Sequence, residues 1–222
     1  MDAVSVIALS MGAAWASGIN LYATLFMLGY MGTTGNINLP AEMEVLSNPM
    51  VMTAAGFMYC VEFFADKIPG VDSGWDTIHT FIRIPAGAML ASSAVGDVTP
   101  AVELTSAILG GVLATGTHTT KAGSRLLINT SPEPVSNWTA SISEDLLVIG
   151  GLWAALYHPV LFIIGLIIFI LVMIWLLPRL WRLIKRVFYR IGSWLGLCEP
   201  LPPLEEETKS VDSTEPIEQT KT

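Results

Sequence analysis

"VEFFADKIPGVDSGWDTIHTFIR", from Val61 to Arg83, places an unusual density of ionisable side chains between two apolar segments. Ionisable groups inside a membrane domain are costly, usually face the interior of a helix bundle, and mark functional sites or buried ion pairs. The stretch therefore predicts a polar interior in an otherwise apolar helical protein. Its ionisable residues are Glu62, Asp66, Lys67, Asp72, Asp76, His79 and Arg83.

The composition of the whole chain agrees with a membrane location. Of the 222 residues, 52% are hydrophobic and 14% are charged, whereas a soluble domain carries about 25% charged residues. A helix needs about 20 apolar residues to cross the hydrocarbon core. We therefore expect an all-α fold, a polytopic helical membrane bundle of five to six segments with interrupted or short helices. The apolar runs cover residues 4–30, 50–65, 78–95, 100–117 and 146–177.

The number of segments depends on "YHP" at residues 157–159. Pro159 has no backbone donor and disfavours helix at His158, so a turn there gives six segments and a kink gives five. The basic stretch "PRLWRLIKRVFYR" (178–190) is expected on the cytoplasmic side. With six segments, Lys67, Lys121 and Arg125 fall on that same side, so we favour six segments and a cytoplasmic C-terminus.

The chain divides into three regions. Residues 1–177 are the predicted transmembrane domain. Residues 178–197 are predicted to form a basic amphipathic helix at the membrane interface, because apolar residues alternate with Lys and Arg. Residues 198–222 are rich in Pro, Glu, Ser and Thr, lack aromatic residues, and predict an acidic disordered tail. The apolar residues of the interfacial helix are Trp181, Ile184, Phe188 and Trp194.

Two segments resemble each other. "MGAAWASGIN" (11–20) and "LGGVLATGTH" (109–118) match without gaps at several small residues, and Asn20 then aligns with His118. Small residues also recur in packed membrane helices for steric reasons, which is a second explanation. A repeat of three plus three segments would be inverted, because an odd number reverses the orientation. Inverted repeats are common in transporters, whose sites lie at interrupted helices near the midplane.

The ionisable residues recur at helical spacing, which places them on shared faces. Glu133, in "SPEP", lies instead in a rigid connection between two prolines. The groups either line a buried, hydrated site or form structural ion pairs, for example Glu62 with Arg83 or Lys121. The three groups that each share one helix face are Glu62 with Asp66; Asp76 with His79 and Arg83; and His118 with Lys121 and Arg125.

A long ordered series of motifs resembles one family. It consists of "VEFFADKIPGVDSGWDTIHTFIRIPAGA", "THTTKAGSRLLINTSPEPVSNW", an "SED" helix start and "PRLWRLIKR". The series resembles the domain of unknown function 4126 family over roughly residues 8–187. One departure is Ile84, where the family is expected to place proline directly after Arg83. The resemblance implies a multi-pass protein of the bacterial inner membrane and brings no established activity.

We favour a transporter or flippase-like carrier for a small anion or an anionic lipid-linked group over an enzyme. It would need no cofactor, and its partners would be membrane lipids and the anion. A homo-oligomer is compatible with the sequence, whereas nucleic-acid binding is not supported because the only basic stretch adjoins a membrane segment. Arg83, His118, Lys121, Arg125 and Asn20 are the predicted substrate-binding residues. Glu62, Asp66, Asp76, His79 and Glu133 are the predicted coupling or gating residues.

Two alternatives remain from the sequence. A membrane-embedded phosphate-ester hydrolase or transferase could hold a hard cation such as Mg²⁺ with Asp66, Asp72, Asp76 and His79, because carboxylates suit such ions. Their spacing matches no metal motif, and no nucleophile elbow, P-loop or HExxH motif is present. A non-catalytic membrane scaffold would instead bind partners through the amphipathic helix and the tail.

Overall fold

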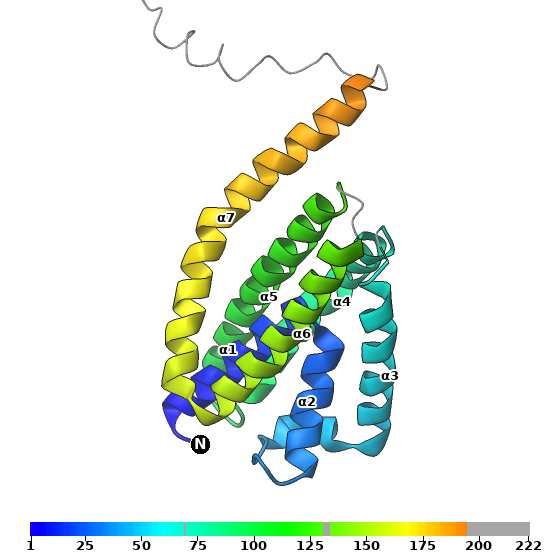
Figure 1. Cartoon of the computed structure of the whole chain (residues 1–222). Coiled ribbons are helices and arrows are strands. Elements are labelled where there is room, and N and C mark those ends of the chain that lie inside the picture. The colour runs from blue at the N-terminus through cyan, green and yellow to red at the C-terminus, as the bar shows by residue number, and fades with distance from the viewer. Residues whose placement is uncertain (69, 131–133, 195–222) are drawn as a thin grey trace, which may run out of the picture. The chain divides into compact units, whose positions relative to one another are not determined.

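The structure is a computed structural model that describes residues 1–68, 70–130 and 134–194, and Figure 1 shows its arrangement. These residues form helices and no strand, in agreement with the predicted all-α class. The elements are α1 (Ala3–Ile19), α2 (Leu21–Thr33), the 3-10 helix η1 (Ala41–Ser47), α3 (Pro49–Ala65), α4 (Val71–Ala94), α5 (Pro100–Ile128), α6 (Pro134–Tyr157) and α7 (Pro159–Trp194).

The expected first segment, residues 4–30, is not one continuous helix. Asn20 has extended backbone angles (φ −143°, ψ 99°) and ends α1. Its side chain accepts a hydrogen bond from the backbone N–H of Ala23 and so caps the start of α2, which is the usual role of Asn at this position. In Figure 1, α1 rises from the N-terminus and α2 descends again, so the chain doubles back at Asn20.

The other segments agree with the sequence in order and differ in length. α3 matches residues 50–65 closely, and His158 separates α6 from α7, as the turn hypothesis predicts. α4 begins before residue 78, α5 continues past residue 117, and α6 begins at Pro134 rather than near residue 146. The apolar runs underestimated these helices because their polar ends face inward and remain helical.

The two aligned segments differ in structure at their last aligned residues, Asn20 and His118. α1 ends at Asn20, whereas α5 continues through the aligned residue His118 without a break. The N-terminal hairpin of α1 and α2 therefore has no counterpart at the start of the second half. The inverted repeat stays a prediction from the sequence.

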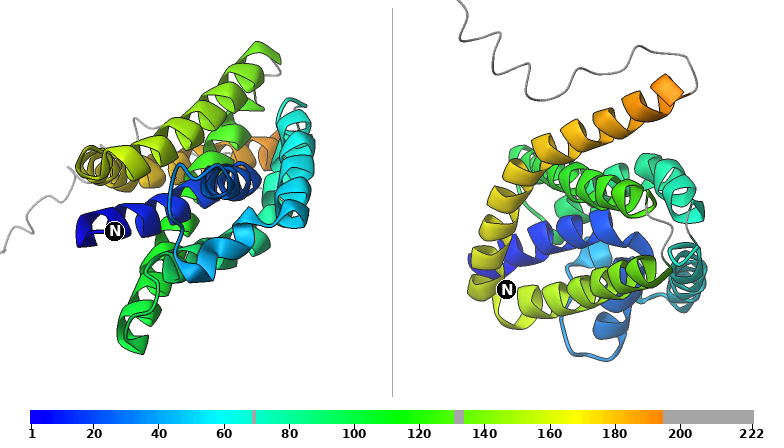
Figure 2. Two further views of the ribbon diagram at one scale, coloured as in Figure 1. Left: turned by 90° about the horizontal axis from the view of Figure 1, so that it is seen from below. Right: turned by 45° about the horizontal axis from the view of Figure 1, so that its top comes forward.

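A seam of small residues lets three helices approach closely. α1 packs against α4, α5 and α6, and Figure 2 (right) shows it lying between α5 and α6. A Cβ atom built on Gly18 would lie 2.6 Å from the carbonyl oxygen of Ala114, and one on Gly110 would lie 2.9 Å from that of Gly87. Only glycine fits at these contacts, as is typical of packed membrane helices.

Large apolar side chains lie on the surface, and charged side chains lie in the interior beside the apolar core. Large apolar side chains are exposed on several helices; for example, Phe81 of α4 is 82% exposed and Phe57 of α3 is 67% exposed. Charged residues such as Arg83 and Glu62 are instead fully buried. Exposed apolar areas of this extent mark contact with lipid or with another protein.

By length and composition, two of the described helices could cross a membrane: Val135–Tyr157 and Pro159–Arg186. α4 and α5 have 24 and 29 residues and are not among the helices that meet this criterion. This is weak support for membrane association. The number of membrane crossings stays a prediction from the sequence.

α7 continues without interruption through Pro178, the expected start of a separate amphipathic helix. The described residues from Trp181 to Trp194 belong to a second unit, in which the Lys185 ammonium lies 5.4 Å from the centroid of the Trp181 ring. The side chains of Phe188 and Trp194 lie outside those described. The predicted tail at 198–222 lies outside the described residues, and the scaffold hypothesis stays a prediction from the sequence.

The glycine seam predicts opposite effects of two Gly→Ala substitutions. Gly18→Ala should lower the free energy of unfolding by about 1–3 kcal/mol, because the new methyl group overlaps the backbone of α5. Gly150→Ala is the matched control: at this helical position no atom lies within 4 Å of the place that a methyl group would take, so the change should be neutral or stabilising by up to about 1 kcal/mol. Thermal unfolding in detergent measures both, and equal shifts would contradict the close packing.

Candidate functional site

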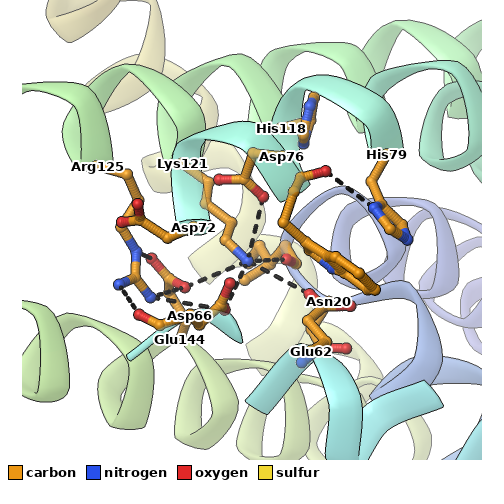
Figure 3. Close-up of polar contacts among 12 residues, drawn as sticks. Asn20, Glu62, Asp66, Asp72, Asp76, His79, His118, Lys121, Arg125 and Glu144 are labelled. Atoms are coloured by element: carbon orange, nitrogen blue, oxygen red, sulfur yellow. Dashed lines mark hydrogen bonds and ion pairs between the residues drawn. The ribbon is translucent and has the colours of Figure 1, made fainter. Parts of the chain in front are cut away.

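Seven ionisable residues meet in the interior and are referred to below as the charge cluster. They come from four helices, and Figure 3 shows most of them converging on the Lys121 ammonium. All are buried except Glu144, which is partly exposed. The charge cluster consists of Glu62 and Asp66 at the end of α3, Asp76 and Arg83 of α4, Lys121 and Arg125 of α5, and Glu144 of α6.

Lys121 is the centre of the charge cluster. Its ammonium nitrogen lies 3.0 Å from Asp66 Oδ2 and 3.4 Å from Glu62 Oε1. It also lies 3.5 Å from Glu144 Oε2 and 3.6 Å from Asp76 Oδ1. One cation therefore faces carboxylates from three different helices, which compensates the large cost of burying them.

The Lys121 ammonium also contacts the break in the N-terminal hairpin. It donates a hydrogen bond of 3.1 Å to the backbone carbonyl of Ile19, the last residue of α1. The C-terminal carbonyls of a helix lack partners within it and carry partial negative charge, so a cation is favoured there. Asn20, at the break itself, donates to Asp145 Oδ1 of α6 at 3.1 Å.

Arg83 forms the second cationic contact of the charge cluster. Its guanidinium pairs with Glu62 Oε1 through Nη2 and with Asp76 Oδ1 through Nη1, the latter at 3.0 Å. Nη1 also lies 3.1 Å from Nδ1 of His118. The group is fully buried, and its Nε has no hydrogen-bond partner among the described residues.

Arg125 holds the opposite end of the charge cluster with good geometry. It makes a two-point contact with Glu144, with Nε to Oε1 at 3.0 Å and Nη2 to Oε2 at 2.7 Å. Its Nη1 donates to the backbone carbonyls of Asp66, at 2.9 Å, and Asn137, at 3.2 Å. Such fork-shaped contacts are the strong class of ion pair, so Arg125 joins α5 to α3 and α6.

The charge cluster contains one more carboxylate than it has cations. Several of its buried oxygen atoms also have no hydrogen-bond partner among the described residues, namely Glu62 Oε2, Asp66 Oδ1 and Asp76 Oδ2. Buried polar atoms are normally paired. The surplus of carboxylate and the unpaired oxygens together give the charge cluster the capacity to hold additional protons.

The structure brings most of the predicted site residues together. Six of the ten lie in the charge cluster, and His118 contacts Arg83 of the cluster. Asn20 donates instead to Asp145, and it follows Ile19, whose carbonyl accepts from Lys121. His79 lies beside the charge cluster and bonds instead to Tyr22 and the Trp75 carbonyl. Glu133 lies outside the described residues.

The four ligands of the alternative metal site do not come together. Asp72 accepts hydrogen bonds from the amide of Asn129, at 2.7 and 3.0 Å, rather than facing Asp66 or Asp76. Among the described residues, no group of three or more His, Cys, Asp or Glu side chains is arranged to hold a metal ion. Asp72 therefore ties the start of α4 to the end of α5.

A family model described as a domain of unknown function (DUF4126) matches residues 7–179. The chain belongs to the DUF4126 family. The match confirms the resemblance seen in the sequence and includes the whole charge cluster. No curated protein and no solved structure matches the chain.

Sequence analysis of this DUF4126 protein missed the contribution of α6. Asn137, Ser141, Glu144 and Val148 are spaced i, i+4, i+7 and i+11 and lie on the inward face. The apolar run that marked this helix begins only after Asp145, so the polar half appeared to be a loop. The spacing could have identified it, because a helical face continues from polar into apolar residues without a change of period.

Lys67 is a further buried cation next to the site. Its ammonium donates to the carbonyl of Phe63 at 3.0 Å and lies 3.3 Å from the Ser141 hydroxyl. It also lies over the Phe63 ring, 2.9 Å from its centroid, which is a favourable cation–π contact. None of the ion pairs among the described residues includes Lys67, so aromatic and hydroxyl groups replace a carboxylate partner.

The two-point contact between Arg125 and Glu144 predicts strong coupling between these residues. Arg125→Ala should cost about 3–5 kcal/mol, because it leaves a carboxylate and two backbone carbonyls without their donor. For a protein of this size the unfolding midpoint should fall by about 6–20 °C. The double variant Arg125→Ala/Glu144→Ala should cost less than the sum of the single variants, by about 0.5–3 kcal/mol.

A thermal-unfolding cycle in detergent measures this coupling. Arg179→Ala is the control, because Arg179 is an exposed arginine whose described contacts are with Trp175 of the same helix. Its unfolding midpoint should stay near that of the wild type. Strict additivity of the two cluster substitutions would show that the contact contributes nothing to stability.

Proposed function

We propose that this DUF4126 protein is a multi-pass membrane carrier that moves a small anion, or the anionic head group of a lipid-linked compound, together with protons. The exposed apolar side chains would face lipid, and the charge cluster would be the transport site. Ionisable residues buried in a membrane domain mark such pathways. The inner-membrane location and the cytoplasmic C-terminus are part of the proposal.

The observation that carries the proposal is the surplus of one carboxylate around three buried cations, with three of the four carboxylates buried and Glu144 partly exposed. In the resting arrangement Arg83, Lys121 and Arg125 are neutralised by carboxylates. An anion cannot bind them while those carboxylates keep their charge, because like charges repel. Protonation of Glu62 or Asp66 removes that competition.

Protonation then favours anion binding. A buried cation that loses its counter-ion is strongly destabilised, and an incoming phosphate or carboxylate group can replace the lost charge. Arg83 offers a planar fork that suits these groups, and its Nε, unpaired among the described residues, supplies a donor. A proton and an anion therefore bind together, which is the thermodynamic basis of coupled transport.

The break at Asn20 supports the same function. Transporters place their sites where helices are interrupted, because the free helix ends contribute partial charges and can change their contacts. Here the end of α1 is held by Lys121, and α2 begins at Leu21, directly after Asn20. If Lys121 changes partner when an anion binds, the α1–α2 hairpin loses a hydrogen bond and can shift.

Replacing Glu62 by glutamine tests the proposal directly. Glu62→Gln mimics the protonated carboxyl group and should let an anion bind at all pH values. Binding of phosphate, sulfate and simple carboxylates to the detergent-solubilised wild type should strengthen by about 5- to 150-fold as the pH is lowered. In Glu62→Gln this pH dependence should largely disappear, while binding itself is retained.

Transport provides the second readout. Liposomes containing the wild type and an internal pH dye should acidify when a gradient of the bound anion is applied, and those containing Glu62→Gln should not. Glu103→Gln is the matched control, since Glu103 is an exposed acid in the first turn of α5. Pairing that is purely structural would give anion binding in neither protein.

The source of the anion is distinguished by native mass spectrometry of Glu62→Gln. A retained phospholipid, such as phosphatidylglycerol, would identify a lipid head group as the substrate class. A small ion that exchanges with added phosphate would identify a soluble anion. Wild-type binding that does not depend on pH would contradict the coupling of anion to proton.

A further inference from the structure

Two buried histidines flank the charge cluster in different hydrogen-bonding environments. His79 lies on α4 and His118 on α5, with 3% and 2% of their surface exposed, and Figure 3 shows them separated from one another. The sequence alone gives the two residues the same context, since each belongs to a His-Thr pair followed by a cation. Their hydrogen bonds distinguish them.

The contacts of His118 define one neutral tautomer. Arg83 carries only donors, so Nδ1 of His118, 3.1 Å from Arg83 Nη1, must accept and therefore has no proton. The Thr80 hydroxyl donates its hydrogen to the carbonyl of Asp76 at 3.0 Å. Its oxygen must then accept from Nε2–H of His118 at 2.7 Å.

The contacts of His79 define a different tautomer with a different capacity. Nδ1 lies 2.9 Å from the carbonyl oxygen of Trp75, which can only accept, so Nδ1 carries a proton. Nε2 lies 3.1 Å from the hydroxyl of Tyr22. A hydroxyl can donate or accept, so this contact survives whether Nε2 is bare or protonated.

A second proton would therefore have opposite effects at the two sites. On His118 it would sit on Nδ1, so the hydrogen bond from Arg83 Nη1 would be lost and two N–H donors would face each other. The positively charged imidazolium would also lie against the Arg83 guanidinium. On His79 it would keep both hydrogen bonds. The imidazole is also stacked on the Trp75 ring, with centroids 4.3 Å apart, and an aromatic face attracts a cation.

The charged surroundings of His79 are mixed. Asp76 of α4 favours a second proton on His79, whereas Arg83 of α4, Lys121 of α5 and the burial of the ring oppose it. Tyr22, the second residue of α2, faces it from beyond the break at Asn20 and is in turn influenced by Glu62 of α3. His79 is thus connected through Tyr22 to the hairpin that the proposed transport cycle would move.

We infer that His79 is the proton-accepting histidine of this site, with Tyr22 and the Trp75 ring as its partners, and that His118 is a permanently neutral acceptor that orients Arg83. The inference rests on the proposed function for the use of the proton, but the protonation states are properties of the protein alone. Tyr22 and Trp75 are assigned a role that the sequence did not suggest.

Nitrogen NMR of ¹⁵N-histidine-labelled protein in nanodiscs tests the inference without a substrate. The chain has three histidines, so each signal is assigned by removing one at a time, with His158→Gln for the third. We expect the Nδ1–H tautomer of His79 to give way to the doubly protonated form as the pH is lowered from about 8 towards about 5. His118 should remain a neutral Nε2–H tautomer throughout.

Variants separate proton acceptance from positioning. His79→Gln should remove one proton from the uptake of the protein over this pH range, measured by titration with a dye. His118→Asn keeps an acceptor in the place of Nδ1 and should bind phosphate like the wild type, whereas His118→Leu should weaken this binding. Tyr22→Phe, which removes the hydroxyl but not the ring, should shift the Nε2 resonance of His79 without altering His118.

Two results would overturn the assignment: double protonation of His118, or a His79 that stays neutral down to about pH 5. The outcome is independent of the transport assay. Correct protonation states with no anion-driven acidification would overturn the proposed function and leave the assignment of the histidines intact. Coupled transport with a doubly protonated His118 would support the proposed function and overturn the assignment of the histidines.

Discussion

The contacts of one ammonium group constrain much of this structure. Lys121 must be compensated because it is buried, and its partners come from α1, α3, α4 and α6. No single helix can provide all of these partners, so the burial of Lys121 requires the four helices to converge on α5. The convergence in turn requires close approach of α1, α4 and α5, which the glycines of the seam permit. Electrostatic compensation and small-residue packing are therefore two aspects of one arrangement.

A buried ion network is weak evidence for stability, because apolar residues of similar volume often stabilise a core at least as well. The helices of this protein carry many apolar residues on their outer surface, with exposed Phe, Ile and Leu on α3 to α7. Retention of charge in the interior then needs another reason. Substrate binding and proton exchange are reasons of that kind, and both depend on the groups being ionisable.

The sequence predicts the parts of this structure that depend on local spacing. Helical periodicity correctly places Glu62 and Asp66 on one helix face, and Asp76 and Arg83 on another. The turn at His158 follows from Pro159. The break at Asn20 was missed because Lys121, which bonds the carbonyl of Ile19 at the end of α1, lies 102 positions further along the chain. The polar half of α6 was missed because a search for apolar runs discards residues whose polarity is directed inward. Family membership followed from the motif series, whereas the pairing of each carboxylate required three-dimensional contacts.

A comparison within the molecule separates two kinds of buried carboxylate. Asp72 is fully buried, and both of its oxygens are bonded, to Asn129 and to the backbone amides of Gly70 and Ser73. Glu62 and Asp76 are equally buried, but each has one oxygen without a hydrogen-bond partner among the described residues. Both carboxylates pair with Arg83, whose Nε likewise has no partner among the described residues. If burial alone required every carboxylate oxygen to accept a hydrogen bond, Glu62 and Asp76 would have both oxygens bonded, as Asp72 does.

These unpaired atoms belong to the Arg83 side of the charge cluster, while Arg125 at the other side is bonded to Glu144 and two backbone carbonyls. A further unpaired oxygen among the described residues, Oδ1 of Asp66, belongs to a carboxylate that pairs with Lys121 and Arg125 through Oδ2. A group whose hydrogen bonds are all made can change partners only by breaking one of them, which is costly in a buried site. The Arg125 side is thus suited to hold helices together. The Arg83 side has the donors and acceptors that a proton and an anion require.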